Sequence, residues 1–181
     1  MHPRLAELLA YLDAQRARVV GAASDLPPER WGVRPAPDRW SVAEVYWHLQ
    51  RVEQGVAKLI RKRATEAREQ GIPAEQETSS ALGALDHARL ADRSWVMFAP
   101  PQVSPPAEIP SAEMVQQQLE ESRQMLRAAV AEADGLALGS VRHPHPLLGE
   151  IDLYQWILFV GQHEGRHAVQ IEEAAKALAR S

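Results

Sequence analysis

Two histidines near the end of this 181-residue sequence have the spacing of a metal-binding pair. His163 and His167 are four residues apart, so on a helix they lie one turn apart on the same face. At 100° per residue, both fall within about 60° of Val160, on the apolar stripe of their segment. Two imidazoles placed in this way can each give one ring nitrogen to the same metal ion.

A third histidine, His48, occupies a similar position on a second predicted helix. It falls within about 60° of Val45, which begins the apolar stripe of that helix. If the two helices face each other, three neutral imidazoles meet and leave coordination positions open for water or substrate, as in catalytic metal sites. Three imidazoles suit zinc, nickel, copper or iron, so the pattern does not identify the metal. The alternative is that these histidines are hydrogen-bonded residues of the core.

The segment 163–167 also fits the H-E-x-x-H pattern of zinc peptidases, in which the glutamate is the general base. The extended peptidase pattern fails, because Gln170 and Glu173 stand where it requires Gly and His. A peptidase is therefore the weaker interpretation. We expect Glu164 either to act as a catalytic residue, which orients a ligand histidine or accepts a proton, or to form a salt bridge with an arginine elsewhere.

Three further residues are candidates for contact with a substrate. Trp47 is the neighbour of His48 and is placed to line the rim of a pocket. His145 precedes a proline in a segment just before the last predicted helix, and Arg166 lies between the two paired histidines. Each has a structural alternative, which is core packing for Trp47, loop formation for His145 and solvation for Arg166.

The composition limits the classes of function. The chain has no cysteine, which excludes disulfides, thiolate zinc sites, iron–sulfur clusters and a cysteine nucleophile. The formal net charge of −4 argues against a nucleic-acid partner, which requires a basic surface. Because there is neither a signal peptide nor an apolar run long enough to span a bilayer, we expect a cytoplasmic protein with no membrane partner.

Amphipathic helices are expected to position these residues. Ser41 and Glu44 have the spacing of a capping box at the start of the helix that carries His48. Asp152 and Gln155 repeat that spacing ahead of the paired histidines. Four helices are predicted, over about residues 3–23, 41–70 and 111–134 and from residue 152 onward.

The connections between these helices are predicted to be irregular. Residues 71–110 are rich in proline and too long for a simple loop, with one short helix expected over about 81–92. The stretch 141–149 is expected to be a loop, and no strand is predicted. The chain is therefore predicted to form a single all-α domain, a four-helix bundle.

The sequence resembles the DinB/YfiT-like superfamily of metalloenzymes in three motifs that follow one another along nearly the whole chain. The first runs from Trp40-Ser41 to His48-Leu49, ahead of and within the second predicted helix. The others are His-Pro-Leu-Leu-Gly-Glu at 145–150 and His-Glu-Gly-Arg-His at 163–167. The proline-rich stretch 99–110 is also similar to the family.

This resemblance implies one DinB-like bundle domain over residues 1–181, with long crossover connections, including the irregular segment 71–110, and often a homodimer. It implies a divalent metal, nickel or zinc, on His48, His163 and His167. Relatives include S-transferases that activate a low-molecular-weight thiol, such as bacillithiol or mycothiol, and metal-dependent hydrolases. We therefore expect an enzyme that uses its metal to activate a thiol or water against a small-molecule substrate. A non-catalytic bundle, in which a metal only joins helices, is the alternative.

Overall fold

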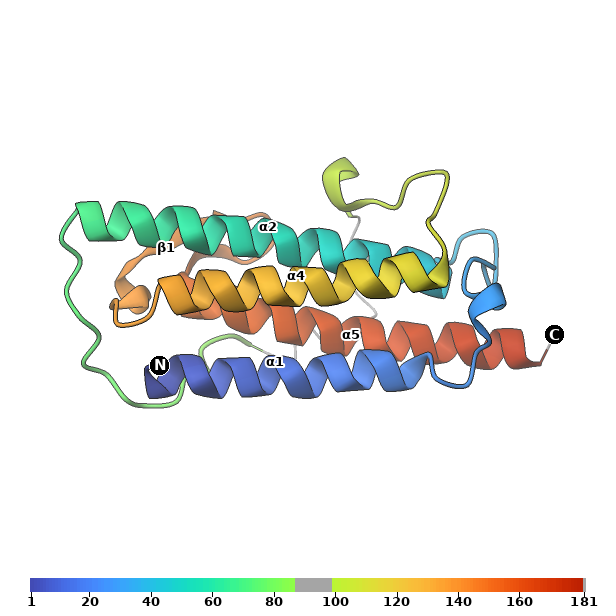
Figure 1. The fold of residues 1–181 in the computed structure, drawn as a ribbon, viewed down its shortest axis with the longest axis horizontal. Helices are drawn as coiled ribbons and strands as arrows, with labels where there is room; N and C mark the ends of the chain where they lie inside the picture. Colours follow the sequence, from blue (N-terminus) through green and yellow to red (C-terminus); the bar gives the residue numbers. More distant parts are fainter. Residues whose placement is uncertain (87–98, 181) are drawn as a thin grey trace.

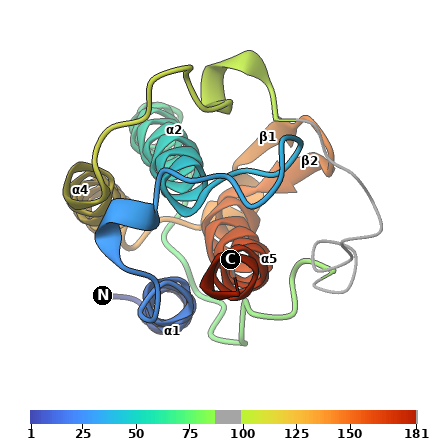
Figure 2. The same cartoon turned by 90° about the vertical axis from the view of Figure 1, so that its right-hand side faces the viewer.

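The computed structural model describes residues 1–86 and 99–180. Within these residues, four long helices lie side by side along the molecule (Figure 1). Seen along the bundle, α1 lies next to α5, and α2 lies between α4 and α5 (Figure 2). The predicted four-helix bundle is therefore confirmed. The helices are α1 (Pro3–Ala22), α2 (Val42–Glu69), α4 (Ala112–Glu132) and α5 (Leu153–Ala179).

The helices α2 and α4 run in the same direction (Figure 1). Glu53 of α2 is level with Arg123 of α4, and Arg61 is level with Glu132, so residue numbers rise together along the pair. Two successive helices that run in parallel need a connection that returns along the bundle. This connection, of which residues 70–86 and 99–111 are described, is therefore the expected long crossover. No helix of the described residues has both the length and the apolar character needed to cross a membrane.

Local sequence sets the starts of the helices. The side chain of Ser41 accepts the backbone N–H of Glu44, whose carboxylate accepts the backbone N–H of Ser41, so the predicted capping box is present. Asp152 and Gln155 form the second capping box. Ser111 caps α4 through its hydroxyl. Both helices that carry the candidate metal ligands therefore begin at the predicted residues.

The expectation that the chain forms no strand is wrong. β1 (Arg142–His145) and β2 (Gly149–Asp152) pair antiparallel just before α5, with Gly149 at φ 74°, a backbone conformation that favours glycine. Both strands have only four residues and β1 contains a proline, so they show too little alternation to be recognised. The helix expected over 81–92 is absent from 81–86, and the remainder of that prediction lies outside the described residues.

The connections also contain short 3₁₀ helices, and one of them reaches the candidate site. In the described residues these are η1 (Pro28–Arg30), η2 (Pro101–Val103) and η3 (Leu138–Ser140). The segment η2 belongs to the crossover and contacts α2.

Two glycines allow α1 to approach α5 closely. A Cβ atom on Gly161 would lie 2.7 Å from Cε1 of Tyr11, and one on Gly165 would lie 2.8 Å from Oε1 of Gln15. These glycines are on the face of α5 that is turned toward α1. The remaining faces of α5 are therefore available to α2 and to the connections, and His163 lies on the face turned toward α2.

Candidate metal site

Three histidines from two helices meet inside the bundle with their Nε2 atoms converging. His48 Nε2 of α2 and His167 Nε2 of α5 each lie 3.1 Å from His163 Nε2. The three potential ligand atoms all lie within 4.8 Å of one another. All three side chains are buried. The structure therefore brings together the three residues that the sequence predicted as metal ligands.

In two of these rings the other nitrogen, Nδ1, lies within hydrogen-bond distance of a carbonyl oxygen. His48 Nδ1 lies 2.7 Å from the backbone oxygen of Val103 in η2. His167 Nδ1 lies 2.8 Å from the side-chain oxygen of Gln170, one turn further along α5. Because a carbonyl oxygen only accepts hydrogen bonds, each Nδ1 carries the ring proton. Each Nε2 therefore presents a lone pair to the centre of the cluster.

This arrangement of protons fits a cation at the centre. Two Nε2 lone pairs face the single Nε2 of His163, which can donate no more than one hydrogen bond. His163 can therefore donate to only one of these two lone pairs, whereas a single cation can bind both. Neutral imidazole nitrogens are ligands that zinc and nickel accept. The donor set thus fits a divalent metal.

Burial keeps two of these imidazoles neutral. It lowers the pKa of His48, although the hydrogen bond to Val103 partly opposes the effect. Burial also lowers the pKa of His163 well below its usual range, with a further contribution from His167 and His48. Because metals bind the neutral form of histidine, protons compete weakly with a metal at neutral pH.

Aromatic rings pack against the histidines from two sides. The ring of Trp40 lies 5.0 Å from that of His48 and is nearly parallel to the ring of His167 at 6.5 Å. The ring of Phe159 stacks on His163 at 5.3 Å. These contacts restrict the orientation of the imidazoles. Trp40 was not among the residues predicted for the site, although its place directly before the N-cap of α2 was a signal for proximity to His48.

A cavity of about 750 Å³ adjoins the histidines, all three of which line it. Among the described residues of its lining, the charged ones are Asp38 and the three arginines Arg39, Arg51 and Arg166. The apolar part of the lining comes from α2, α5 and the hairpin turn and includes Val52, Val56, Leu59, Leu147, Trp156 and Phe159. A largely apolar small molecule can therefore occupy the cavity next to the potential ligand atoms.

The structure places two of the three predicted substrate-contact residues in the lining of this cavity. His145 and Arg166 are both part of it. Trp47 is not among the lining residues, because adjacent residues of a helix point about 100° apart and only His48 faces the cavity. Trp47 instead packs against the buried cluster between α1, α2, α4 and α5, with the guanidinium of Arg51 over its ring at 5.7 Å. Its placement agrees with the core-packing alternative.

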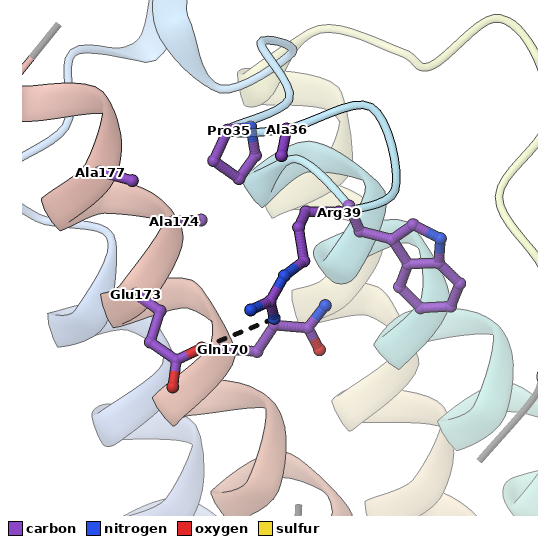
Figure 3. Close-up of a pocket in the computed structure, with 8 residues that line it drawn as sticks. Pro35, Ala36, Arg39, Gln170, Glu173, Ala174 and Ala177 are labelled. Carbon is purple, nitrogen blue, oxygen red and sulfur yellow. Dashed lines mark ion pairs between the residues drawn. The ribbon is translucent and has the colours of Figure 1, made fainter. Parts of the chain in front are cut away.

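A smaller pocket of about 220 Å³ lies beside the cavity (Figure 3). Arg39, Trp40 and Gln170 line both spaces. In Figure 3, Arg39 extends from the loop before α2 toward Glu173 of α5, and the two side chains form an ion pair at 3.9 Å. Gln170 therefore stands between the two spaces at the point where it fixes the ring of His167.

Glu164 lies in the core within a closed ring of four charged side chains, one from each helix. Its Oε1 accepts a hydrogen bond from Arg16 at 2.7 Å, and its Oε2 accepts one from Arg123 at 2.8 Å. Glu53 completes the ring by accepting from both arginines at 2.6 Å. All four side chains are buried. The structure thus shows the salt-bridge alternative for Glu164 and places it outside the cavity lining.

Comparisons with known proteins extend over nearly the whole chain. The family model described as the DinB superfamily matches residues 11–171, which include all three histidines. The uncharacterized protein YuaE of Bacillus subtilis (strain 168) is 28% identical over 156 residues, which cover 86% of this chain and 90% of that protein. The crystal structure of TT2238, a four-helix bundle protein, matches with a TM-score of 0.54 and 20% identity over 98% of this chain and 99% of that one. This last likeness concerns the fold alone.

Proposed function

Because the chain belongs to the DinB superfamily, we propose that it is a metal-dependent enzyme whose divalent metal is held by His48, His163 and His167. The observation that carries this proposal is the convergence of three buried Nε2 atoms in the wall of a cavity of about 750 Å³. Nickel and zinc are the metals proposed, since both accept imidazole nitrogen. Three protein ligands leave coordination positions for a substrate or cosubstrate.

The most specific form of the proposal is an S-transferase for a low-molecular-weight thiol such as bacillithiol. A divalent metal supplies a lowered pKa to a thiol or water that it binds, and so provides a nucleophile at neutral pH. The carbonyl groups of Val103 and Gln170 keep His48 and His167 in the ligating tautomer. Since the chain has no cysteine, a sulfur nucleophile has to arrive on a cosubstrate.

A hydrolase of the same family is the nearest alternative, because the same geometry serves water in place of a thiol. A peptidase has less support, because Arg16 and Arg123 hold both oxygens of Glu164 in the core. A non-catalytic metal site would require a fourth protein ligand. In the residues that the structure describes, the group of converging ligand atoms consists of the three histidines, which favours an open site.

Metal analysis of untagged protein tests the first step. We expect about one equivalent of nickel or zinc per chain, and protein that neither contains nor takes up either metal would overturn the proposal. The double variant His163→Ala/His167→Ala should lose the metal while its circular dichroism still shows the helix content of the bundle. The variant His2→Ala is the control, because His2 lies at the N-cap of α1 and does not line the cavity.

A screen of thiol cosubstrates against simple alkylating electrophiles, with several reconstituted metals, tests the transferase. Turnover that requires both thiol and metal supports it. Metal-dependent turnover of esters or amides without a thiol supports the hydrolase instead, and chelator-sensitive cleavage of casein supports the peptidase.

A further inference from the structure

His145 occupies a buried position where the hairpin meets α5. It is the last residue of β1, and its ring lies 4.5 Å from that of Phe159 and 4.8 Å from that of Trp156. Phe159 in turn stacks on the ring of His163. His145 lines the cavity that adjoins the three converging histidines. It is therefore separated from a candidate metal ligand by one aromatic ring.

The hairpin turn fixes the tautomer of His145. Its Nδ1 accepts hydrogen bonds from the backbone N–H groups of Leu147 at 3.1 Å and Leu148 at 3.3 Å. Backbone N–H groups only donate, so Nδ1 carries no proton and the ring proton of the neutral form is on Nε2. Burial lowers the pKa of His145 to about 4, so the ring stays neutral under ordinary conditions.

The Nε2–H group of His145 is accessible from the cavity. Both hydrogen bonds of this side chain to described residues are made by Nδ1. Nε2 makes neither of these bonds and is not fully enclosed by the protein, so it remains in contact with solvent. A ring that is neutral near pH 7, with its donor toward a cavity, can bind an acceptor and is a poor source of a proton.

We propose that His145 orients the substrate by donating a hydrogen bond from Nε2 to an oxygen acceptor, a carbonyl or carboxylate, on the molecule that occupies the cavity. The proposal rests on the proposed function only in taking this cavity as the substrate site. The ligand class is then a largely apolar molecule that carries such an oxygen. The apolar side chains of α2 and α5 in the lining fit its body.

Two variants of His145 distinguish the role of its Nε2 donor from that of its Nδ1 acceptor. In His145→Asn, the side-chain oxygen can replace Nδ1 as the acceptor for the turn, but the donor at the position of Nε2 is lost. In His145→Gln, the longer side chain places an N–H group near the position of Nε2, but the acceptor for Leu147 and Leu148 is lost. The Asn variant therefore keeps the turn, and the Gln variant keeps the donor.

The binding of acetophenone and of ethylbenzene to zinc-loaded protein, titrated by saturation-transfer NMR, tests the proposal. These probes are similar in shape, and only the ketone carries an oxygen acceptor. We expect the wild-type chain to bind the ketone about 3- to 10-fold more tightly, which corresponds to one net hydrogen bond. The Asn variant should lose this preference and the Gln variant should retain most of it, although thermal unfolding should show the Gln variant to be less stable.

If His145 had a purely structural role, the ketone preference would follow the stability of the variants. The less stable Gln variant would then lose the preference, and the Asn variant would keep it. An unchanged ketone preference in the Asn variant, or no saturable ketone binding to the wild type, would overturn the proposal. The zinc content of each variant is measured in the same samples and should not change. If the ketone preference depends on His145 but no thiol or water reaction is found, the proposed enzyme fails and this inference stands.

Discussion

Arg16 and Glu164 join α1 to α5 through a buried ion pair in which Nη2 lies 2.6 Å from Oε1. The pair belongs to the ring that Glu53 and Arg123 complete from α2 and α4. Since Glu164 is the residue after His163, the ring anchors α5 next to the candidate metal site. Two positive and two negative charges balance one another there, so removal of Glu164 leaves Arg16 and Arg123 to share one buried carboxylate, that of Glu53.

We predict that Glu164→Gln lowers the free energy of unfolding by about 3–5 kcal/mol, because Arg16 and Arg123 then keep an excess positive charge away from water. Urea denaturation measures the change. Glu132→Gln is the matched control, because the Arg61–Glu132 pair is exposed and screened by solvent, so its loss should change the free energy of unfolding far less. Equal effects of the two substitutions would show that the buried ring has no special role in stability.

Gln170→Leu is predicted to weaken metal binding about 10- to 100-fold, because His167 loses the acceptor that holds its Nδ1 proton. Competition with a chromogenic chelator measures the affinity for zinc. Glu173→Gln is the control, because Glu173 lines the smaller pocket and pairs with Arg39. A normal affinity in the Gln170 variant would mean that the carbonyl does not set the tautomer of His167.

Nickel binding is predicted to quench part of the tryptophan fluorescence through Trp40, whose ring lies 5.0 Å from that of His48. Trp40→Phe should remove most of the response, whereas Trp31→Phe should preserve it. Trp31 packs on Tyr46 and does not line the cavity. Fluorescence titration with nickel measures the effect, and a response that survives in the Trp40 variant would place the metal elsewhere.

The pKa of His145, lowered to about 4 by burial, predicts a contribution to the pH dependence of stability. In the unfolded chain the pKa is about 6.5, so between pH 4 and pH 6.5 the unfolded state binds more protons than the folded state. This contribution is fully present above pH 6.5 and is lost as the pH falls toward 4. Between pH 7.5 and pH 5, wild type should lose about 1–2 kcal/mol more than His145→Asn in urea denaturation. Equal losses would contradict a neutral, buried His145.

Sequence periodicity was sufficient to predict the three histidines as a group, because each lies on the apolar stripe of a long helix whose start is marked by a capping box. It was harder to predict from the helical rotation per residue which neighbours of His48 line the cavity. Trp47 and Trp40 are both close to His48 in sequence, yet it is Trp40, outside the helix, that lines the cavity. A helical wheel describes residues within a helix and cannot place a residue that precedes it.

The partners of Glu164 could not be identified from the sequence. Arg16 is 148 residues away and Arg123 is 41 residues away. On their own helices both look like ordinary polar positions, and only the packing of four helices turns them inward. The hairpin was missed for a different reason, since its strands obtain their order from pairing with each other and from the start of α5 rather than from a local pattern.

The hydrogen bond between His48 and Val103 joins a candidate metal ligand to the crossover. Docking of the crossover and metal binding are therefore two coupled equilibria. If the docked crossover strengthens metal binding by a given factor, then by reciprocity bound metal strengthens docking of the crossover by the same factor. Release of the crossover from the bundle would therefore lower the affinity of the three histidines for a metal.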